Sequence, residues 1–82
     1  MDEFEKVLGR VIAEARRSAG MSQEALAFRC KLHPTYISQL ERGLKSPTVR
    51  TLRIIAGALG TNAPALLLTA ETGPAPLEET DA

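Results

Sequence analysis

One short stretch of the chain, KLHPTYISQLERG at residues 31–43, is rich in side chains that can donate hydrogen bonds. The donors are Thr35, Tyr36, Ser38, Gln39 and Arg42. Between them stand Ile37 and Leu40, which are three residues apart and would share one face of a helix. A helix that buried these two would turn its hydroxyl and amide groups outward, where they could bind a polar partner.

Catalytic and metal chemistry find little support in the rest of the chain. The chain has one His and one Cys. With no second His and no cysteine pair, His33 is not expected to bind a metal, and the single His and single Cys offer no credible nucleophile–base pair. No Gly-rich loop of the phosphate-binding kind is present. We therefore expect no enzyme, no metal and no cofactor. Cys30 has no disulfide partner and is expected to be buried as a small apolar side chain.

Apolar residues recur at helical spacing in five segments, and no strand-like alternation is present. The expected helices lie within residues 4–20, 21–30, 34–42, 48–60 and 62–70. Helix-starting residues occupy suitable positions before or at these segments: Ser22, His33 followed by Pro34, Ser46 or Thr48, and Asn62. In the fourth segment the stripe expected to face the core consists of Val49, Leu52, Ile55, Ala56 and Leu59. The sequence predicts an all-α fold.

Length and charge set the domain organisation. The chain has 82 residues, enough for one small core, and we expect a single domain over residues 1–70. Residues 71–82 are acidic, Pro-rich and poor in apolar side chains, so we expect a disordered tail.

The net charge is zero, yet residues 6–70 hold ten Lys or Arg and only three acidic residues, a local charge of +7. A local field of this kind attracts polyanions although the total charge is zero.

No apolar run approaches the roughly 18 residues that a membrane-spanning helix needs. The start of the chain, MDEFEK, is acidic and lacks the pattern of a secretion signal. We expect a cytoplasmic protein that does not enter a membrane.

The stretch from Ser22 to Gly43 resembles the helix-turn-helix of the phage-repressor type, as found in the Xre family of bacterial and phage transcription regulators. The segments that carry this resemblance are SQEALA, LHPTYISQLERG and SPTVRTLRIIAGALG. It extends over residues 4–69 and includes caps, turns and apolar positions in register. The stretch LHPTYIS is also similar to the controller proteins of restriction–modification systems. The resemblance implies a five-helix, phage-repressor-like fold with the helix-turn-helix at the second and third helices.

Two positions depart from the family pattern. Lys31 stands where the family often has Gly, because that residue adopts a left-handed backbone conformation, at a cost of about 1 kcal/mol for a side-chain-bearing residue. Pro34 occupies a position that often carries a base-contacting Arg or Gln. The first departure is compatible with the turn, and the second changes the expected base preference.

The resemblance implies that the second helix of the motif lies in the major groove of DNA while the first crosses the phosphate backbone. The residues expected to contact base edges directly are then Thr35, Tyr36, Ser38 and Gln39. Gln can pair with adenine through two hydrogen bonds, and Thr can bond a base or touch a thymine methyl. Phosphate contacts position the protein without distinguishing sequences. The residues expected to make them are Gln23, Arg42, Lys45, Ser46 and Thr48. Tyr36 has a second interpretation, in which its ring packs against the preceding helix.

Glu41 needs a different role, since phosphate would repel a carboxylate on this helix. It lies four residues after Ile37 and should turn inward. The resemblance supplies a partner on the first helix, Arg16. We expect a largely buried Arg16–Glu41 ion pair that serves structure.

The last helix contains more consecutive apolar residues than one face can bury, so Leu66 and one neighbour can close the core while the remainder would lie exposed. Family members dimerise through this region, and we assign Leu66, Leu67 and Leu68 to a homodimer interface. The hypothesis is a sequence-specific transcriptional regulator that binds an inverted repeat in double-stranded DNA and needs no small-molecule effector. The alternative is a protein-interaction module, such as an antitoxin-like partner. A monomer whose tail covers Leu67 or Leu68 also remains open.

Overall fold

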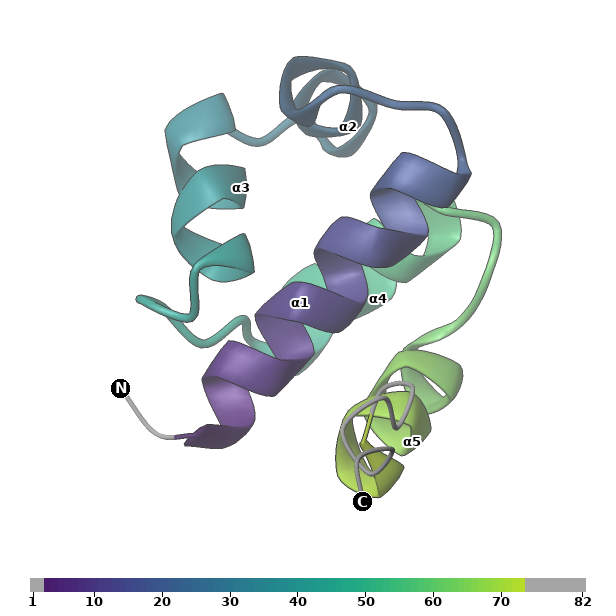
Figure 1. Ribbon diagram of the computed structural model, residues 1–82. Helices are drawn as coiled ribbons and strands as arrows, with labels where there is room; N and C mark the ends of the chain where they lie inside the picture. Colours follow the sequence, from purple (N-terminus) through teal and green to yellow (C-terminus); the bar gives the residue numbers. More distant parts are fainter. Residues whose placement is uncertain (1–2, 74–82) are drawn as a thin grey trace.

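The computed structural model describes residues 3–73, and within that range it contains five helices and no strand. The helices are α1 (Glu3–Ser18), α2 (Gln23–Cys30), α3 (Pro34–Glu41), α4 (Val49–Ala58) and α5 (Ala63–Thr72). In Figure 1, α1 crosses in front of α4, with α5 on one side and α2 and α3 on the other. The predicted all-α, five-helix fold is confirmed.

Side-chain caps set the starts of the last four helices. The cap residues are Ser22, His33, Thr48 and Asn62. Thr48 rather than Ser46 caps α4, since its Oγ1 accepts the N–H of Thr51 at 3.0 Å. At the start of α3, Nδ1 of His33 accepts the N–H of Thr35 at 3.1 Å. Losing such a cap costs about 1 kcal/mol, so local chemistry fixes where these helices begin.

The turn between α2 and α3 depends on one strained residue. Lys31 has φ 58° and ψ 41°, in the left-handed region, and it is the only non-Gly residue with positive φ among those described. The following N–H, of Leu32, donates to the carbonyl of Ala27 at 2.9 Å and closes the end of α2. The predicted left-handed conformation at Lys31 is confirmed.

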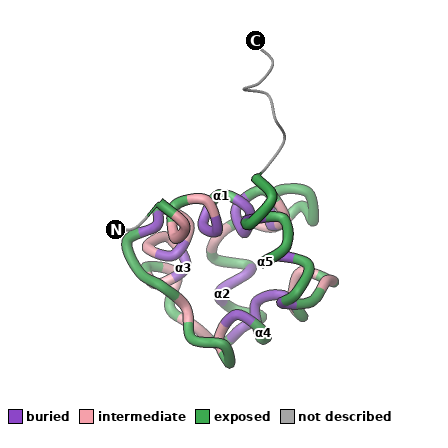
Figure 2. Tube along the Cα trace, turned by 90° about the horizontal axis from the view of Figure 1, so that it is seen from below, coloured by how far each residue is buried: buried purple, intermediate pink, exposed green. Residues whose placement is uncertain are grey.

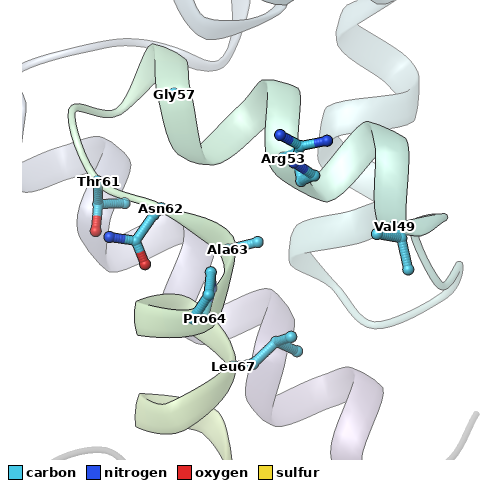
Figure 3. Close-up of a pocket in the computed structure, with 8 residues that line it drawn as sticks. All are labelled: Val49, Arg53, Gly57, Thr61, Asn62, Ala63, Pro64 and Leu67. Carbon is cyan, nitrogen blue, oxygen red and sulfur yellow. The ribbon is translucent and has the colours of Figure 1, made fainter.

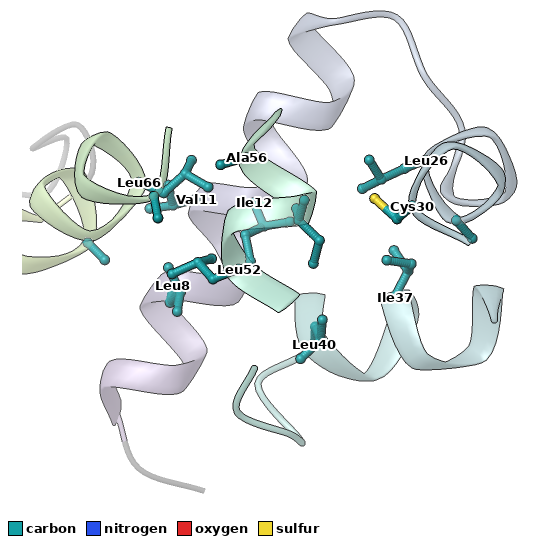
Figure 4. Close-up of a cluster of buried hydrophobic side chains, with 14 residues drawn as sticks. Leu8, Val11, Ile12, Leu26, Cys30, Ile37, Leu40, Leu52, Ala56 and Leu66 are labelled. Atoms are coloured by element: carbon teal, nitrogen blue, oxygen red, sulfur yellow. The ribbon is translucent and has the colours of Figure 1, made fainter. Parts of the chain in front are cut away.

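The core lies between all five helices. Its largest fully buried side chains are Ile12, Leu26, Ile37, Leu40 and Ile55. Figure 4 shows Ile37 of α3 facing Leu26 and the sulfur of Cys30 on α2. Burial raises the pKa of the Cys30 thiol, which keeps it protonated and unreactive. Buried and exposed positions follow one another along each helix in Figure 2, as expected for amphipathic helices around one core.

Close backbone contact joins α1 to the end of α3. Gly9 is buried, and a Cβ at this position would collide with the carbonyl oxygens of Leu40 and Glu41. The absence of a side chain lets the two helix backbones touch. As a result α1 supports α3 from behind, directly at the end that carries Glu41.

Two expectations need correction. Val49 was assigned to the buried stripe of α4, but it is 76% exposed. It is the first residue of α4 and lines a surface cavity, whereas Leu52 and Ile55 further along the helix are buried. The helix α5 also continues to Thr72, two residues into the expected tail, where Oγ1 of Thr72 donates to the carbonyl of Leu68. The rest of the tail prediction concerns residues 74–82, outside the described range.

No single helix in the described range is both long and apolar enough to span a membrane. The helices α4 and α5 pass that test only when combined, and they are bent by 100° relative to each other.

Candidate nucleic-acid interface

The helix α3 separates its apolar and polar side chains as the sequence predicted. Ile37 and Leu40 are 0% and 1% exposed. Thr35 is exposed, and Ser38 and Gln39 are partly exposed. These three side chains form the outer surface of α3 and remain predicted base contacts.

Tyr36 takes an intermediate position. Its side chain is partly buried and packs against the hydrophobic core. The ring of Tyr36 thus packs on the protein, and its contact with α2 in particular stays a prediction. The phenol hydroxyl remains a predicted DNA contact.

Polar and basic side chains follow α3 on an exposed loop. Arg42, Lys45 and Ser46 are all exposed, as expected for groups that would contact phosphate. Thr48 is exposed too, but its hydroxyl caps α4 and donates to Oγ1 of Thr51 at 3.0 Å. Since its oxygen accepts the cap hydrogen bond and its proton is donated to Thr51, Thr48 is the least available of the five predicted phosphate contacts.

Arg16 and Glu41 form the expected ion pair. Nε of Arg16 donates to Oε2 of Glu41 at 2.6 Å, and Nη2 donates to Oε1 at 3.0 Å. The two side chains are 10% and 5% exposed. The hydrogen bond to Glu41 is the main cause that raises the pKa of Arg16. Nη1 of Arg16 also donates to the carbonyl of Met21 at 2.8 Å, so the pair holds the link between α1 and α2 as well.

Gln23 lies at the first position of α2, where unpaired N–H groups and the helix dipole favour an anion. The sequence predicted its amide as a phosphate contact. In the structure its Nε2 donates to Oε1 of Glu41 at 2.9 Å. No local spacing in the sequence indicates this bond, because the two residues are 18 positions apart.

The three leucines of α5 do not share one environment. Leu66 is 4% exposed and closes the core, as expected, so it offers little surface to the dimer interface to which it was also assigned. Leu67 and Leu68 are 36% and 64% exposed. The helix packs on both α1 and α4, which turns Leu66 inward and leaves its two neighbours outside.

Leu67 also lines a surface cavity of about 580 Å³ between α4 and α5. Figure 3 shows Val49 and Arg53 of α4 together with Leu67 of α5 around this cavity. We call Val49, Leu67 and Leu68 the α4–α5 patch. Sequence analysis missed Val49 because its apolar character suggested burial.

A further exposed apolar side chain, Phe28 on α2, was also missed, and it is 85% exposed. Within residues 3–73 no group of His, Cys, Asp and Glu side chains could hold a metal ion.

In this geometry the apolar face of α3 packs on the core and its polar face is exposed to solvent. Such an arrangement is typical of helix-turn-helix DNA-binding regulators. The helix-turn-helix family model HTH_3 matches residues 12–66. The chain belongs to this Xre-type family of transcriptional regulators, whose members bind double-stranded DNA and are not enzymes.

Known proteins similar to the chain include several controllers. It is 42% identical to the control protein C.BamHI of Bacillus amyloliquefaciens over 62 residues, which cover 74% of this chain and 76% of that protein. Among solved structures, the clp gene regulator ClgR of C. glutamicum has a TM-score of 0.83 and 28% identity, covering 90% of this chain and 95% of that one. The controller protein C.Esp1396I, solved as a tetramer with its natural operator, has a TM-score of 0.78 and 28% identity, covering 88% and 95%.

Proposed function

We propose that the protein acts as a homodimer on an inverted-repeat operator, with α3 of each protomer in the major groove. The observation that carries this proposal is the division of α3. Ile37 and Leu40 are buried, while Thr35, Ser38 and Gln39 lie on the outer surface. A helix held by its apolar face can present its polar side chains to base edges without losing core contacts.

Base contacts in this proposal come from Thr35, Tyr36, Ser38 and Gln39. Phosphate contacts come from Gln23, Arg42, Lys45, Ser46 and Thr48. The second group lies at the start of α2 and on the loop after α3, so the phosphates on both sides of the groove would be held. Phosphate contacts set position and base contacts set specificity.

The basic middle of the chain predicts salt-dependent binding. Arg42 and Lys45, the two cationic members of the phosphate set, would neutralise four phosphates in a dimer and give a log–log slope of affinity against salt of about −3.6, from about −0.9 per contact. The measurement is fluorescence anisotropy with a labelled duplex between about 50 and 200 mM salt. A flat response would contradict phosphate binding by this surface.

The α4–α5 patch supports the dimer. Exposed apolar side chains that gather on one surface mark interaction sites. Val49 and Leu67 line one surface cavity, and Leu68, the next residue of α5, is exposed as well. The proposal requires that two copies paired through this patch about a two-fold axis set their recognition helices on successive turns of B-DNA, about 34 Å apart.

Selection of DNA from a random pool tests the whole proposal. The expected product is a set of palindromic sequences whose half-sites are one helical turn apart. Enrichment of single half-sites would contradict the dimer but keep the DNA contacts. Failure to enrich any sequence would contradict sequence-specific binding and favour a protein-interaction module.

Similarity to named control proteins supports a narrower role as the controller of a restriction–modification system. Such a regulator would work in the cytoplasm, block or recruit polymerase at a promoter, and respond to its own concentration rather than to an effector. A neighbouring gene for a methyltransferase or endonuclease is the expected genomic finding. A neighbourhood without either gene would argue for another regulon.

A further inference from the structure

Three helices meet at the carboxylate of Glu41, the last residue of α3. The carboxylate accepts two hydrogen bonds from Arg16 of α1, at 2.6 and 3.0 Å, and one from Nε2 of Gln23 on α2, at 2.9 Å. The Glu41 side chain is 5% exposed. These three donated hydrogen bonds compensate for the hydrogen bonds to water that the carboxylate loses on burial.

The bond to Gln23 fixes the orientation of an amide. A carboxylate is only an acceptor, so the –NH₂ end of the Gln23 amide must face Glu41 rather than the carbonyl end. An amide nitrogen carries two protons, and Glu41 takes one of them. The second proton stays available on a side chain that is only partly buried at the start of α2.

Charge balance makes this arrangement compatible with DNA. A lone carboxylate close to the start of α2 would repel phosphate, but the guanidinium of Arg16 neutralises Glu41 through two hydrogen bonds. A phosphate oxygen near Gln23 would therefore meet an oriented donor and the positive end of the α2 dipole.

We infer that Glu41 is a positioning residue for DNA binding. It holds the amide of Gln23 so that the remaining N–H can donate to a backbone phosphate, and it ties this contact on α2 to the end of the recognition helix. The inference rests on the proposed phosphate contact of Gln23. An amide already held in one orientation loses less rotational freedom on binding, which corresponds to about 2- to 12-fold in affinity per side chain.

A mutant cycle tests the inference. The background Arg16→Met with Glu41→Leu replaces the buried pair by apolar side chains, a change that proteins often tolerate without loss of stability. Gln23→Ala is then introduced into the natural chain and into this background. Binding to the selected duplex is measured by anisotropy, at a temperature where circular dichroism shows every variant folded.

The expected result is that Gln23→Ala weakens binding in the natural chain, and that this loss of affinity is about 2- to 12-fold larger there than in the altered background. Lys45→Ala is the matched control, because Lys45 is exposed and makes no hydrogen bond to Glu41 in the described structure. Its effect should be equal in both backgrounds. If the altered background does not fold, Glu41→Gln serves as the second background. Its neutral amide does not force the –NH₂ end of Gln23 inward, so the effect of Gln23→Ala should again shrink.

Equal losses from Gln23→Ala in both backgrounds would overturn the positioning role while keeping the phosphate contact. No loss in the natural chain would instead refute the phosphate contact itself, and with it the basis of this inference. The two failures are thus distinguishable.

Discussion

At the residue scale, Gln39 has the chemistry to distinguish bases. It lies one helical turn after Thr35 and is partly exposed on the outer surface of α3. An amide with free donor and acceptor atoms can form two hydrogen bonds with adenine. Pro34, which cannot contribute such contacts, leaves more of the discrimination to Gln39.

Gln39→Ala should reduce discrimination at one position of each half-site by about 1–3 kcal/mol. The measurement compares affinities for the selected operator and for duplexes changed at single base pairs. Lys45→Ala is the contrast, since losing a phosphate contact should weaken all duplexes alike. An equal loss on every duplex for Gln39→Ala would make Gln39 a backbone contact.

Arg16 illustrates a different residue-scale effect, because its partner cannot reach water. Arg16→Met should destabilise the fold by about 3–5 kcal/mol, since it leaves the carboxylate of Glu41 buried without its cation. Urea unfolding followed by circular dichroism measures the loss. The double variant with Glu41→Leu should recover most of it. A loss below about 1 kcal/mol would mean that the pair behaves like an exposed one.

At the element scale, the position of α3 depends on how closely α1 approaches it. The collision predicted for a Cβ at Gly9 involves two backbone carbonyls of α3, which cannot move aside as a side chain could. Helix propensity and packing therefore oppose each other at this position. Propensity alone would favour Ala over Gly by about 1 kcal/mol in a helix interior.

Gly9→Ala should destabilise the fold by about 1–3 kcal/mol, because overpacking outweighs propensity. Gly57→Ala in α4 is the matched control. A Cβ there meets nothing within 4 Å, so the variant should be stabilised by up to about 1 kcal/mol. Urea unfolding of both variants gives the comparison. Stabilisation by Gly9→Ala would show that α1 and α3 can separate at low cost.

At the scale of the whole molecule, the features that local chemistry determines were predictable. Helices and caps follow from residue types a few positions apart, whereas the left-handed turn at Lys31 was expected only from the resemblance to the family. The exposure of Val49 at the start of α4 was not predictable from local spacing, because burial depends on which other helix covers each position. The Gln23–Glu41 bond escaped prediction for the same reason, since only packing of α2 on α3 brings these residues together.

Oligomeric state is the property of the whole molecule on which the operator prediction depends. Leu68 is the most exposed leucine of α5, at 64%, and a Glu there would place a charge in the proposed interface. Leu68→Glu should weaken the dimer by at least about 2 kcal/mol, roughly 30-fold in its dissociation constant. Glu favours helices as Leu does, so α5 should persist.

Sedimentation equilibrium over a range of protein concentrations measures this change. Affinity for the palindromic operator should fall more than affinity for a single half-site, because the half-site needs only one protomer. Phe28→Glu is the control, since Phe28 is 85% exposed but lies on α2, outside the patch. It should leave the dimer intact. A dimer that survives Leu68→Glu but dissociates with Phe28→Glu would move the interface from α5 to α2, and the spacing of operator half-sites would have to be predicted anew from that geometry.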